Sequence, residues 1–337
     1  MGKRVNILVI GAGAVGGIVA AVLKKNDYNV QLVTKYQEVA DIANSKGLHI
    51  YGHCGNHHVK VPSIARVMNL KVRPDYVFIA TKAKDMAEAA RNILPFLYDN
   101  CKIISLQNGI VEEELAKIVG EERTIGCTVG WGATMHENAE LEMTSGGEFV
   151  IGYLSKPQDK ALLAIKAMLN PIAPVTISEN ILSDLYSKLI INSCISTLGA
   201  ICGLPLGKML SKRKIRKIFL TIIEEAIAVS DAMNLKVNPY SGKLDYYKLL
   251  QWSKTRQHVF LMAFGNKYRK LISSSLQSLL RGGKTEVLWF NGYIRDKGVE
   301  LKVETPVNSL VTEMVVEIEE KKREIGPANF GDPGFEK

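Results

Sequence analysis

The stretch VNILVIGAGAVGG, residues 5–17, decides the fold of the first half of this 337-residue chain. A strand-length apolar run ends in the spacing GxGxxG and leads directly into an apolar helical stretch. In this pattern Gly11 permits a tight turn, Gly13 lets the backbone approach a pyrophosphate, and Gly16 lets helix and strand pack closely. The helix N-terminus then offers unpaired N–H groups to phosphates. The predicted dinucleotide-binding loop comprises Gly11, Ala12, Gly13, Ala14, Val15 and Gly16.

Beyond this loop, strand and helix patterns alternate through the first half of the chain. Such alternation is typical of a parallel sheet with right-handed crossovers, here a doubly wound α/β fold of the Rossmann type. Strands are predicted at residues 5–10, 29–34, 76–81, 102–107 and 124–129, and helices at 15–24, 84–97 and 112–118. A further strand at 147–154 is expected as an antiparallel addition at the sheet edge.

The pattern changes near residues 170–181, where two prolines occur and no strong period is present. After this segment nearly everything reads as helix. The sequence therefore predicts a Rossmann-type cofactor domain over residues 1–176 and an all-helical domain over residues 177–337. The tail from Gly326 is rich in helix breakers and is expected to be loose.

Two helices of the second domain have recognisable starts. An amphipathic helix over residues 307–318 has Thr305 as its expected cap and Pro306 as its first residue. The basic run 212–217 leads into the amphipathic helix expected from Ile218 and is interpreted as a solvated helix start. Because the run lacks interleaved aromatic residues, we expect no nucleic-acid binding.

The end of the second strand distinguishes between the two nicotinamide cofactors. An NAD site has a carboxylate there, which accepts hydrogen bonds from the ribose hydroxyls. This chain has Thr34 and Lys35 and no acid at the strand tip. A hydroxyl and a cation suit a 2′-phosphate, so the sequence favours NADP (NADPH) over NAD.

Composition excludes several classes of protein. The chain has 43 Lys+Arg and 34 Asp+Glu, a net charge of +9, and its 47% hydrophobic content excludes a largely disordered protein. Five scattered cysteines do not make a disulfide framework, so we expect a cytoplasmic protein. A stretch of 19 uncharged residues, 189–207, contains polar residues, glycines and a proline; we interpret it as a buried helix followed by a loop and expect no membrane span.

A cluster of metal-binding residue types lies within ten residues of the first domain. It contains four histidines and a cysteine, but no second cluster with ligand spacing exists elsewhere. We interpret these side chains as solvated residues of a strand and turn, and expect no metal site. The cluster comprises His49, His53, Cys54, His57 and His58.

Polar residues in the second domain are candidates for chemistry. Lys188, Asn192 and Ser196 are spaced i, i+4, i+8, so they share one helix face in apolar surroundings. Lys188 is either the snorkelling end of a core helix or an ammonium that donates a proton to a developing alkoxide. Further along, Ser274 and Glu286 flank a segment in which the glutamate is either a surface charge or a group that orients the lysine.

At this point the sequence resembles the ketopantoate reductases (2-dehydropantoate 2-reductases) over about residues 5–320. The motifs that carry the resemblance are GAGAVGG, Ala80-Thr81-Lys82, Gln107-Asn108-Gly109, Lys188 with Asn192, and KTEVLWFNG at 284–292. The resemblance implies NADPH-dependent reduction of ketopantoate in pantothenate and coenzyme A biosynthesis. It also implies a Rossmann domain and a helical domain with the site in the cleft between them.

The resemblance assigns roles to individual residues. Lys188 resembles the family's general acid, and Glu286 its partner, which orients the lysine and contacts the substrate hydroxyl. Asn108 resembles the asparagine near the nicotinamide and the substrate. Lys82 resembles a lysine near the cofactor, and Lys35 lies where the family often has an arginine for the 2′-phosphate.

The same resemblance assigns the substrate contacts and shows where this chain departs from the family. Asn192, Ser196 and Ser274 match substrate positions, with Ser274 at the carboxylate. However, the family commonly has asparagine at position 196 and aspartate at position 278, where this chain has Ser196 and Ser278. The type of reaction is therefore better specified than its substrate, expected to be a small anionic 2-oxo acid.

Three functions remain open from the sequence. The first is a ketopantoate reductase, and the second a related NADP-dependent 2-oxo or β-hydroxy acid dehydrogenase. The third is an NADPH-binding regulatory protein without catalysis, against which the presence of Lys188, Asn108 and Glu286 together argues. The sequence also leaves open whether the chain forms a homodimer.

Overall fold

The predicted glycine turn follows an interior strand of a large sheet in the computed structural model, which describes residues 5–136 and 139–335. The chain divides into two compact units, Met1–Leu185 and Tyr186–Lys337, and each is described by itself. The division falls inside helix α6 (Ile181–Cys202). The first turns of α6 pack on the sheet of the first unit, since a Cβ added at Gly126 would lie 2.9 Å from Ile181 and 3.1 Å from Leu185.

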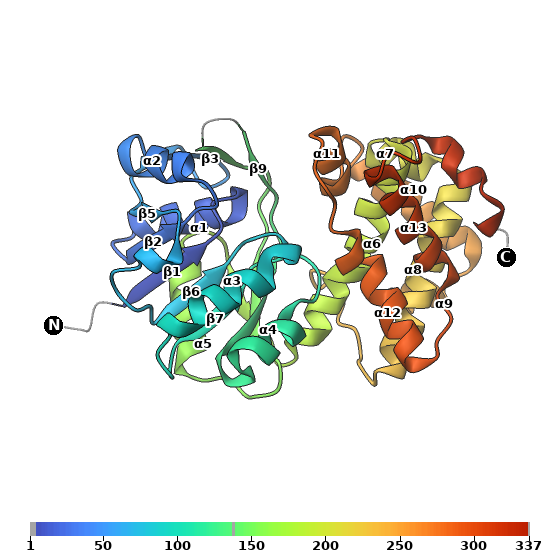
Figure 1. The fold of residues 1–337 in the computed structure, drawn as a ribbon. Helices are drawn as coiled ribbons and strands as arrows, with labels where there is room; N and C mark the ends of the chain where they lie inside the picture. Colours follow the sequence, from blue (N-terminus) through green and yellow to red (C-terminus); the bar gives the residue numbers. More distant parts are fainter. Residues whose placement is uncertain (1–4, 137–138, 336–337) are drawn as a thin grey trace. The chain divides into compact units, whose positions relative to one another are not determined.

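The first unit is built on an eight-stranded sheet (Figure 1). Its order is β12-β11-β8-β7-β6-β1-β2-β5, and all neighbours are parallel except the antiparallel pair β8 and β11. The doubly wound fold is thus confirmed. The strands are β1 (Asn6–Ile10), β2 (Asn29–Val33), β5 (Ser63–Ile64), β6 (Tyr76–Ile79), β7 (Lys102–Ser105), β8 (Thr124–Val129), β11 (Phe149–Tyr153) and β12 (Val175–Ile177).

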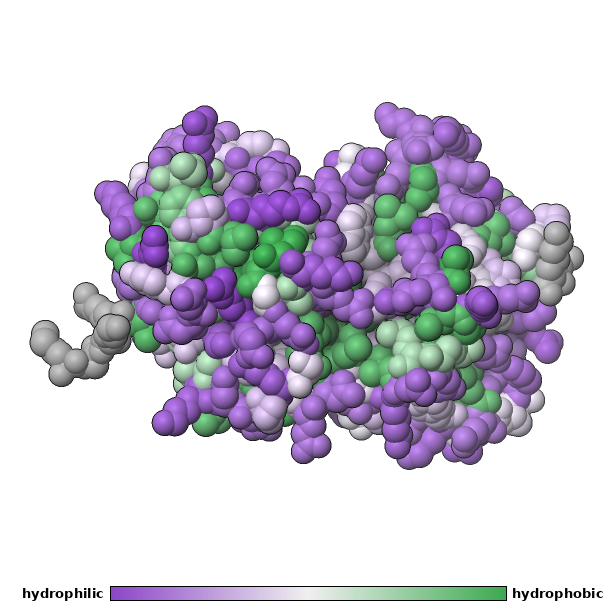
Figure 2. All heavy atoms as spheres, turned by 60° about the horizontal axis from the view of Figure 1, so that its bottom comes forward, coloured by the Kyte–Doolittle hydropathy of each residue, from purple (hydrophilic) through white to green (hydrophobic). Residues whose placement is uncertain are grey.

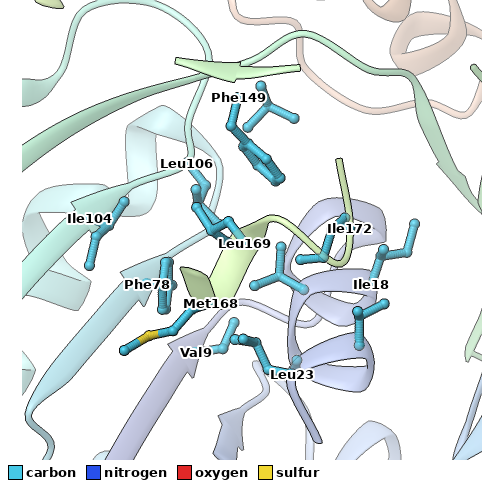
Figure 3. Packing of buried hydrophobic residues seen from close by; sticks show 14 of the residues in the cluster. Val9, Ile18, Leu23, Phe78, Ile104, Leu106, Phe149, Met168, Leu169 and Ile172 are labelled. Carbon is cyan, nitrogen blue, oxygen red and sulfur yellow. The ribbon is translucent and has the colours of Figure 1, made fainter. Parts of the chain in front are cut away.

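Helices cover both faces of this sheet. Figure 3 shows Ile18 and Leu23 of α1 and Met168 of α5 packed with Val9 and Phe78 of the sheet. Side chains alternate between the two faces of a sheet along each strand. The buried strand residues next to Val9 and Phe78 therefore point to the opposite face, where α3 and α4 lie (Figure 1). The helices are α1 (Ala14–Lys25), α2 (Gln37–Ser45), α3 (Met86–Ile93), α4 (Glu112–Val119) and α5 (Lys160–Leu169).

Two predictions about the elements of this unit were right in kind but need correction in detail. The strand near residues 147–154 is antiparallel to β8 as expected, but it is not the edge, because β12 pairs along its other side. The three residues of β12 follow a proline and are too few to show a period. The helix predicted at 84–97 is α-helical only over Met86–Ile93 and has 3₁₀ turns at both ends, Ala83–Asp85 and Leu94–Phe96.

A second, four-stranded sheet packs over α1 and was not predicted. Its order is β4-β3-β10-β9, from β3 (Leu48–Gly52), β4 (His57–Val59), β9 (Ala133–Met135) and β10 (Glu140–Met143). A Cβ at Gly17 would overlap Leu141 of β10, so glycine permits this close packing. The histidine cluster lies on the β3–β4 hairpin, where His49 stacks on His58 with ring centroids 4.1 Å apart. The described residues hold no group of three or more metal-ligand side chains.

The second unit is all-helical, as predicted (Figure 1). Helix α6 is long and apolar enough to cross a membrane. However, 83% of its most apolar stretch is buried within the protein, as in a core helix of a soluble protein. Hydrophilic residues cover most of the face seen in Figure 2. The remaining helices are α7 (Leu206–Ser211), α8 (Arg213–Ala232), α9 (Tyr246–Gln251), α10 (Lys254–Lys267), α11 (Ser274–Leu280), α12 (Asn291–Leu301) and α13 (Pro306–Glu319).

Two sequence predictions for this unit need correction. Helix α8 begins at Arg213 rather than at Ile218, so most of the basic run forms the start of the helix itself. The tail from Gly326 is not loose, because it docks on the end of α6. The N–H of Gly326 donates to the carbonyl of Ile201 at 2.9 Å, and Phe330 is buried.

The N-terminus of α13 is capped from another helix. Pro306 is the first residue as predicted, but the Thr305 side chain makes no capping hydrogen bond. Instead, the carboxylate of Glu225 on α8 accepts from the backbone N–H groups of Val307 and Asn308, each at 2.8 Å, and from Asn308 Nδ2 at 2.7 Å. Burial raises the pKa of Glu225, while these hydrogen bonds act in the opposite direction. Glu225 therefore joins α8 to the start of α13.

We expect Glu225→Gln to lower the free energy of unfolding by about 1–3 kcal/mol, because the amide leaves a buried N–H donor without its acceptor. The matched control is Glu224→Gln on the same helix, whose carboxylate pairs with Lys254 at the surface. We expect the control to cost less than about 1 kcal/mol. Urea denaturation of both variants measures the difference, and equal losses would contradict the capping role.

Candidate functional site

The carboxyl ends of four parallel strands form the candidate cofactor edge of the first unit. In the order β2-β1-β6-β7, the strand that follows β1 in sequence lies on one side of it, and the strand that follows β6 lies on the other side. The strand order therefore reverses between β1 and β6. Ligands of open α/β sheets bind at such a switch point, outside the carboxyl ends of the strands. The predicted residues Lys35, Lys82 and Asn108 each follow one of these strands. The sheet order therefore places them along one edge with the glycine loop.

The three glycines of the loop meet different constraints. A Cβ at Gly11, which has φ +110°, would lie 2.7 Å from the backbone of Ala80, and a Cβ at Gly16 would overlap the Gly11 carbonyl oxygen. Protein packing thus accounts for both. At Gly13, the N-cap of α1, a Cβ would meet nothing within 4 Å. Packing does not require a glycine there, and the open space fits the approach of a pyrophosphate to the backbone.

The tip of β2 presents a cation and no acid. Lys35 is exposed and lies 6.0 Å from the ring centroid of Tyr36. Thr34 does not present its hydroxyl as predicted, because its side chain is buried and donates to the carbonyl of Tyr36 at 2.8 Å. Of this pair, Lys35 therefore remains the candidate for binding a 2′-phosphate.

A buried polar chain joins the ends of β6 and β7. Ser105 Oγ donates to Gln107 Oε1 at 3.0 Å, and Gln107 Nε2 donates to Thr81 Oγ1 at 3.1 Å. The predicted strands ran through Thr81 and Gln107, but the observed strands end earlier, at Ile79 and Ser105. These hydrogen bonds hold the two segments that carry Lys82, which is exposed, and Asn108, which is half-buried.

In the second unit, α6 presents the predicted row of polar side chains. Lys188 and Asn192 are half-buried and Ser196 is buried. Ser196 Oγ lies 3.4 Å from Ser274 Oγ at the start of α11, so the structure brings these two predicted substrate residues together. Ser273 caps α11 and also contacts the carbonyl of Ser196 at 3.3 Å.

The helix is fixed immediately before Lys188. The hydroxyl of Tyr186 donates to the carbonyl of Ala226 on α8 at 2.9 Å, and Tyr246 on α9 donates to the carbonyl of Ser187 at 2.7 Å. Both tyrosines are almost completely buried. These bonds hold α6 in place beside α8 and α9, and with it the backbone position from which Lys188 extends.

Glu286 is buried and starts a 3₁₀ turn, Val287–Trp289. The preceding residue anchors it, since the N–H and hydroxyl of Thr285 both donate to Glu319 Oε1 on α13, at 2.7 and 2.6 Å. A buried glutamate on an anchored turn is more than a surface charge. The pairing of Glu286 with Lys188 stays a prediction.

Sequence reasoning missed a buried polar chain behind this row. Thr197, next to Ser196, hydrogen-bonds Asn291 at the start of α12, and Asn291 Nδ2 donates to Asn308 Oδ1 at 2.9 Å. Asn308 in turn donates to Glu225. Their spacing in sequence gave no signal, because each residue lies on a different helix.

Comparisons with known proteins agree with this arrangement. The family model described as "Ketopantoate reductase PanE/ApbA" matches residues 7–156, and that of its C-terminal region matches residues 180–319. The 2-dehydropantoate 2-reductase of Pyrococcus horikoshii is 26% identical over 312 residues, covering 92% of this chain and 96% of that protein. The Aquifex aeolicus protein of the same name is 25% identical over 312 residues, covering 91% and 95%.

Solved structures show the same fold. A PanE/ApbA family ketopantoate reductase from Ralstonia eutropha JMP134 has a TM-score of 0.81 at 23% identity, covering 95% of this chain and 100% of that chain. D-mandelate dehydrogenase, solved with NADH and anilino(oxo)acetate, has a TM-score of 0.81 at 20% identity, covering 94% and 99%. The fold is thus shared by two groups of oxidoreductases.

The glycine loop allows binding and folding to be tested separately. We expect Gly13→Ala to leave the melting temperature nearly unchanged but to weaken NADPH binding by about tenfold or more, because the methyl group fills the space above the backbone. Gly16→Ala should instead destabilise the protein by about 1–3 kcal/mol, because its methyl group overlaps a carbonyl. Thermal unfolding with and without NADPH measures both effects. A Gly13→Ala protein that binds NADPH normally would contradict the assignment of the loop.

Proposed function

We propose, from the premise that the chain belongs to the ketopantoate reductase (PanE/ApbA) family, that it reduces 2-dehydropantoate (ketopantoate) to pantoate with NADPH. The observation that carries the proposal is the open space above the backbone at Gly13. Gly13 lies at the N-terminus of α1, on the edge of the sheet where the strand order reverses. Both family models match the chain that contains it. We place the reaction in pantothenate and coenzyme A biosynthesis, as the names of the curated relatives suggest.

The reaction adds a hydride to C2 and a proton to the ketone oxygen. Bound NADPH supplies the hydride. We assign the proton to Lys188 Nζ, which donates it to the oxygen as negative charge develops there. This assignment is supported by the position of Lys188 on a helix that two buried tyrosine hydrogen bonds hold in place. A helix held in place reduces the reorganisation needed to position the donor.

The remaining polar residues bind and orient the substrate in this proposal. Glu286 orients the ammonium of Lys188 and accepts a hydrogen bond from the substrate hydroxyl. Asn192 contacts the substrate from the same helix face, and Ser196 and Ser274 bind its carboxylate. The 3.4 Å distance between these two hydroxyls supports a shared role.

Cofactor contacts complete the proposal. The loop from Gly11 to Gly16 receives the pyrophosphate, and Lys82 and Asn108 approach the nicotinamide half from the ends of β6 and β7. Lys35 pairs with the 2′-phosphate. Because β2 ends without a carboxylate, we infer a preference for NADPH over NADH.

A second candidate function is reduction of a different 2-oxo acid. Ser196 and Ser278 depart from the family pattern on the substrate side. The similarity in fold to D-mandelate dehydrogenase shows that the architecture also serves an enzyme with another substrate.

We place the protein in the cytoplasm, and the proposal holds for a monomer or a homodimer.

Substrate identity can be tested by following NADPH oxidation at 340 nm. We expect turnover with ketopantoate and a kcat/KM with NADPH at least about tenfold higher than with NADH, since the 2′-phosphate adds a charge-assisted contact. Phenylglyoxylate and pyruvate serve as comparison substrates. Faster reaction with one of them would favour the second candidate, and NADPH binding without any turnover would favour a regulatory protein.

We expect Lys188→Ala to lower kcat by about 10²-fold or more, because the alkoxide then lacks its proton donor. The Kd of NADPH should stay unchanged. The matched control is Lys248→Ala, which removes an exposed lysine of the same unit that pairs with Asp245. Stopped-flow hydride transfer and NADPH titration measure the two effects. An unchanged kcat would remove Lys188 from the mechanism.

A further inference from the structure

The net positive charge of this protein comes from part of its second unit. Residues 1–185 contain 19 Lys+Arg and 19 Asp+Glu, so the net charge of +9 lies entirely after them. Within the second unit, residues 186–223 contain seven cations and residues 246–285 contain eight, and neither segment has a carboxylate. Charge segregation of this extent creates a field that attracts anions.

The two basic segments pack against each other through α7 and α10, whose labels lie together in Figure 1. Glycines permit the close approach: a Cβ at Gly265 would lie 2.8 Å from Leu210, and one at Gly207 would lie 2.8 Å from Arg269. The N–H of Leu206 also donates to the carbonyl of Leu271 at 2.9 Å. These close contacts hold the two segments side by side.

A groove of about 880 Å³ lies along this junction. Its apolar side is the exposed face of α10, where Val259, Met262 and Ala263 are spaced i, i+3, i+4. Val259 and Met262 are 59% and 50% exposed, which is unusual for large apolar side chains on one helix face. These residues offer a surface for an apolar chain.

The same groove carries three cations: Lys208 from α7, and Arg269 and Lys270 from the connection between α10 and α11. All three are exposed, and none forms an ion pair with the residues that the structure describes. Guanidinium and ammonium groups together suit a phosphate. The groove therefore combines an apolar surface with an anion site.

We propose that this groove binds a soluble amphipathic anion, an alkyl chain that ends in a phosphate. Its volume lies within the range of about 300–1,000 Å³ that small-molecule sites occupy. Ten residues line it, and its volume is that of a small-ligand site. None of the residues assigned to cofactor or substrate lines the groove, so the site is additional to the catalytic one.

The proposal can be tested by isothermal titration calorimetry of the full-length protein with n-octyl phosphate below its micelle concentration. We expect saturable binding, with inorganic phosphate at least about tenfold weaker because it lacks the chain, and no binding of n-octylammonium, which carries the wrong charge. Met262→Glu and Lys270→Glu should each weaken octyl phosphate binding by about tenfold or more. Circular dichroism melting verifies that each variant is folded.

The matched control is Lys217→Glu, which makes the same change of charge at an exposed lysine of α8 outside the groove. It should bind octyl phosphate within about twofold of the unchanged protein. Equal weakening by Lys217→Glu and Lys270→Glu would overturn the proposal in favour of unspecific charge attraction. Binding of inorganic phosphate as tightly as octyl phosphate would also overturn it. A third result would overturn it as well: the protein sediments with phosphatidylglycerol vesicles but does not bind octyl phosphate. In that case the surface recognises a membrane.

Discussion

The close contact between Gly16 and the Gly11 carbonyl is the constraint on which the first unit depends. Because glycine has no side chain, α1 can start directly above the end of β1 and beside Ala80, which follows β6. That placement sets where the helix N-terminus points and leaves the space above Gly13 open. On its other side, Gly17 allows the second sheet to pack on the same helix through Leu141. Fold and cofactor site thus follow from adjacent glycines.

The helical unit is organised around buried polar groups in addition to its apolar core. Glu225 caps α13 from α8, and Asn308 and Asn291 extend this contact to Thr197 on α6. A buried donor or acceptor without a partner costs about 1–3 kcal/mol, so such a chain strongly favours one relative arrangement of its helices. The row beginning at Lys188 lies on the helix that this chain holds. Specificity of packing here therefore serves the proposed chemistry.

The net charge is distributed unevenly between the two units. The first unit is neutral overall although it binds an anionic cofactor in the proposed function, because backbone N–H groups and a few lysines such as Lys35 suffice for that task. The excess cations lie on two segments of the second unit that meet at the groove between α7 and α10. Net charge alone is compatible with nucleic acid, an anionic lipid or an anionic substrate, and it does not indicate where such a ligand binds.

The sequence by itself determined the doubly wound domain, the helical domain and the loop at Gly11–Gly16, because periodicity and glycine spacing are local properties of the chain. It also placed Lys188, Asn192 and Ser196 on one helix face. Only the tertiary structure decided that Thr34 turns inward, that β12 covers the sheet edge, and that Glu225 replaces Thr305 as the cap of α13. The last two outcomes depend on hydrogen bonds between residues far apart in sequence, and no local pattern encodes which distant partner satisfies a buried polar group. The bond of Thr34 is local, to the carbonyl of Tyr36, but its direction follows from the backbone path after β2.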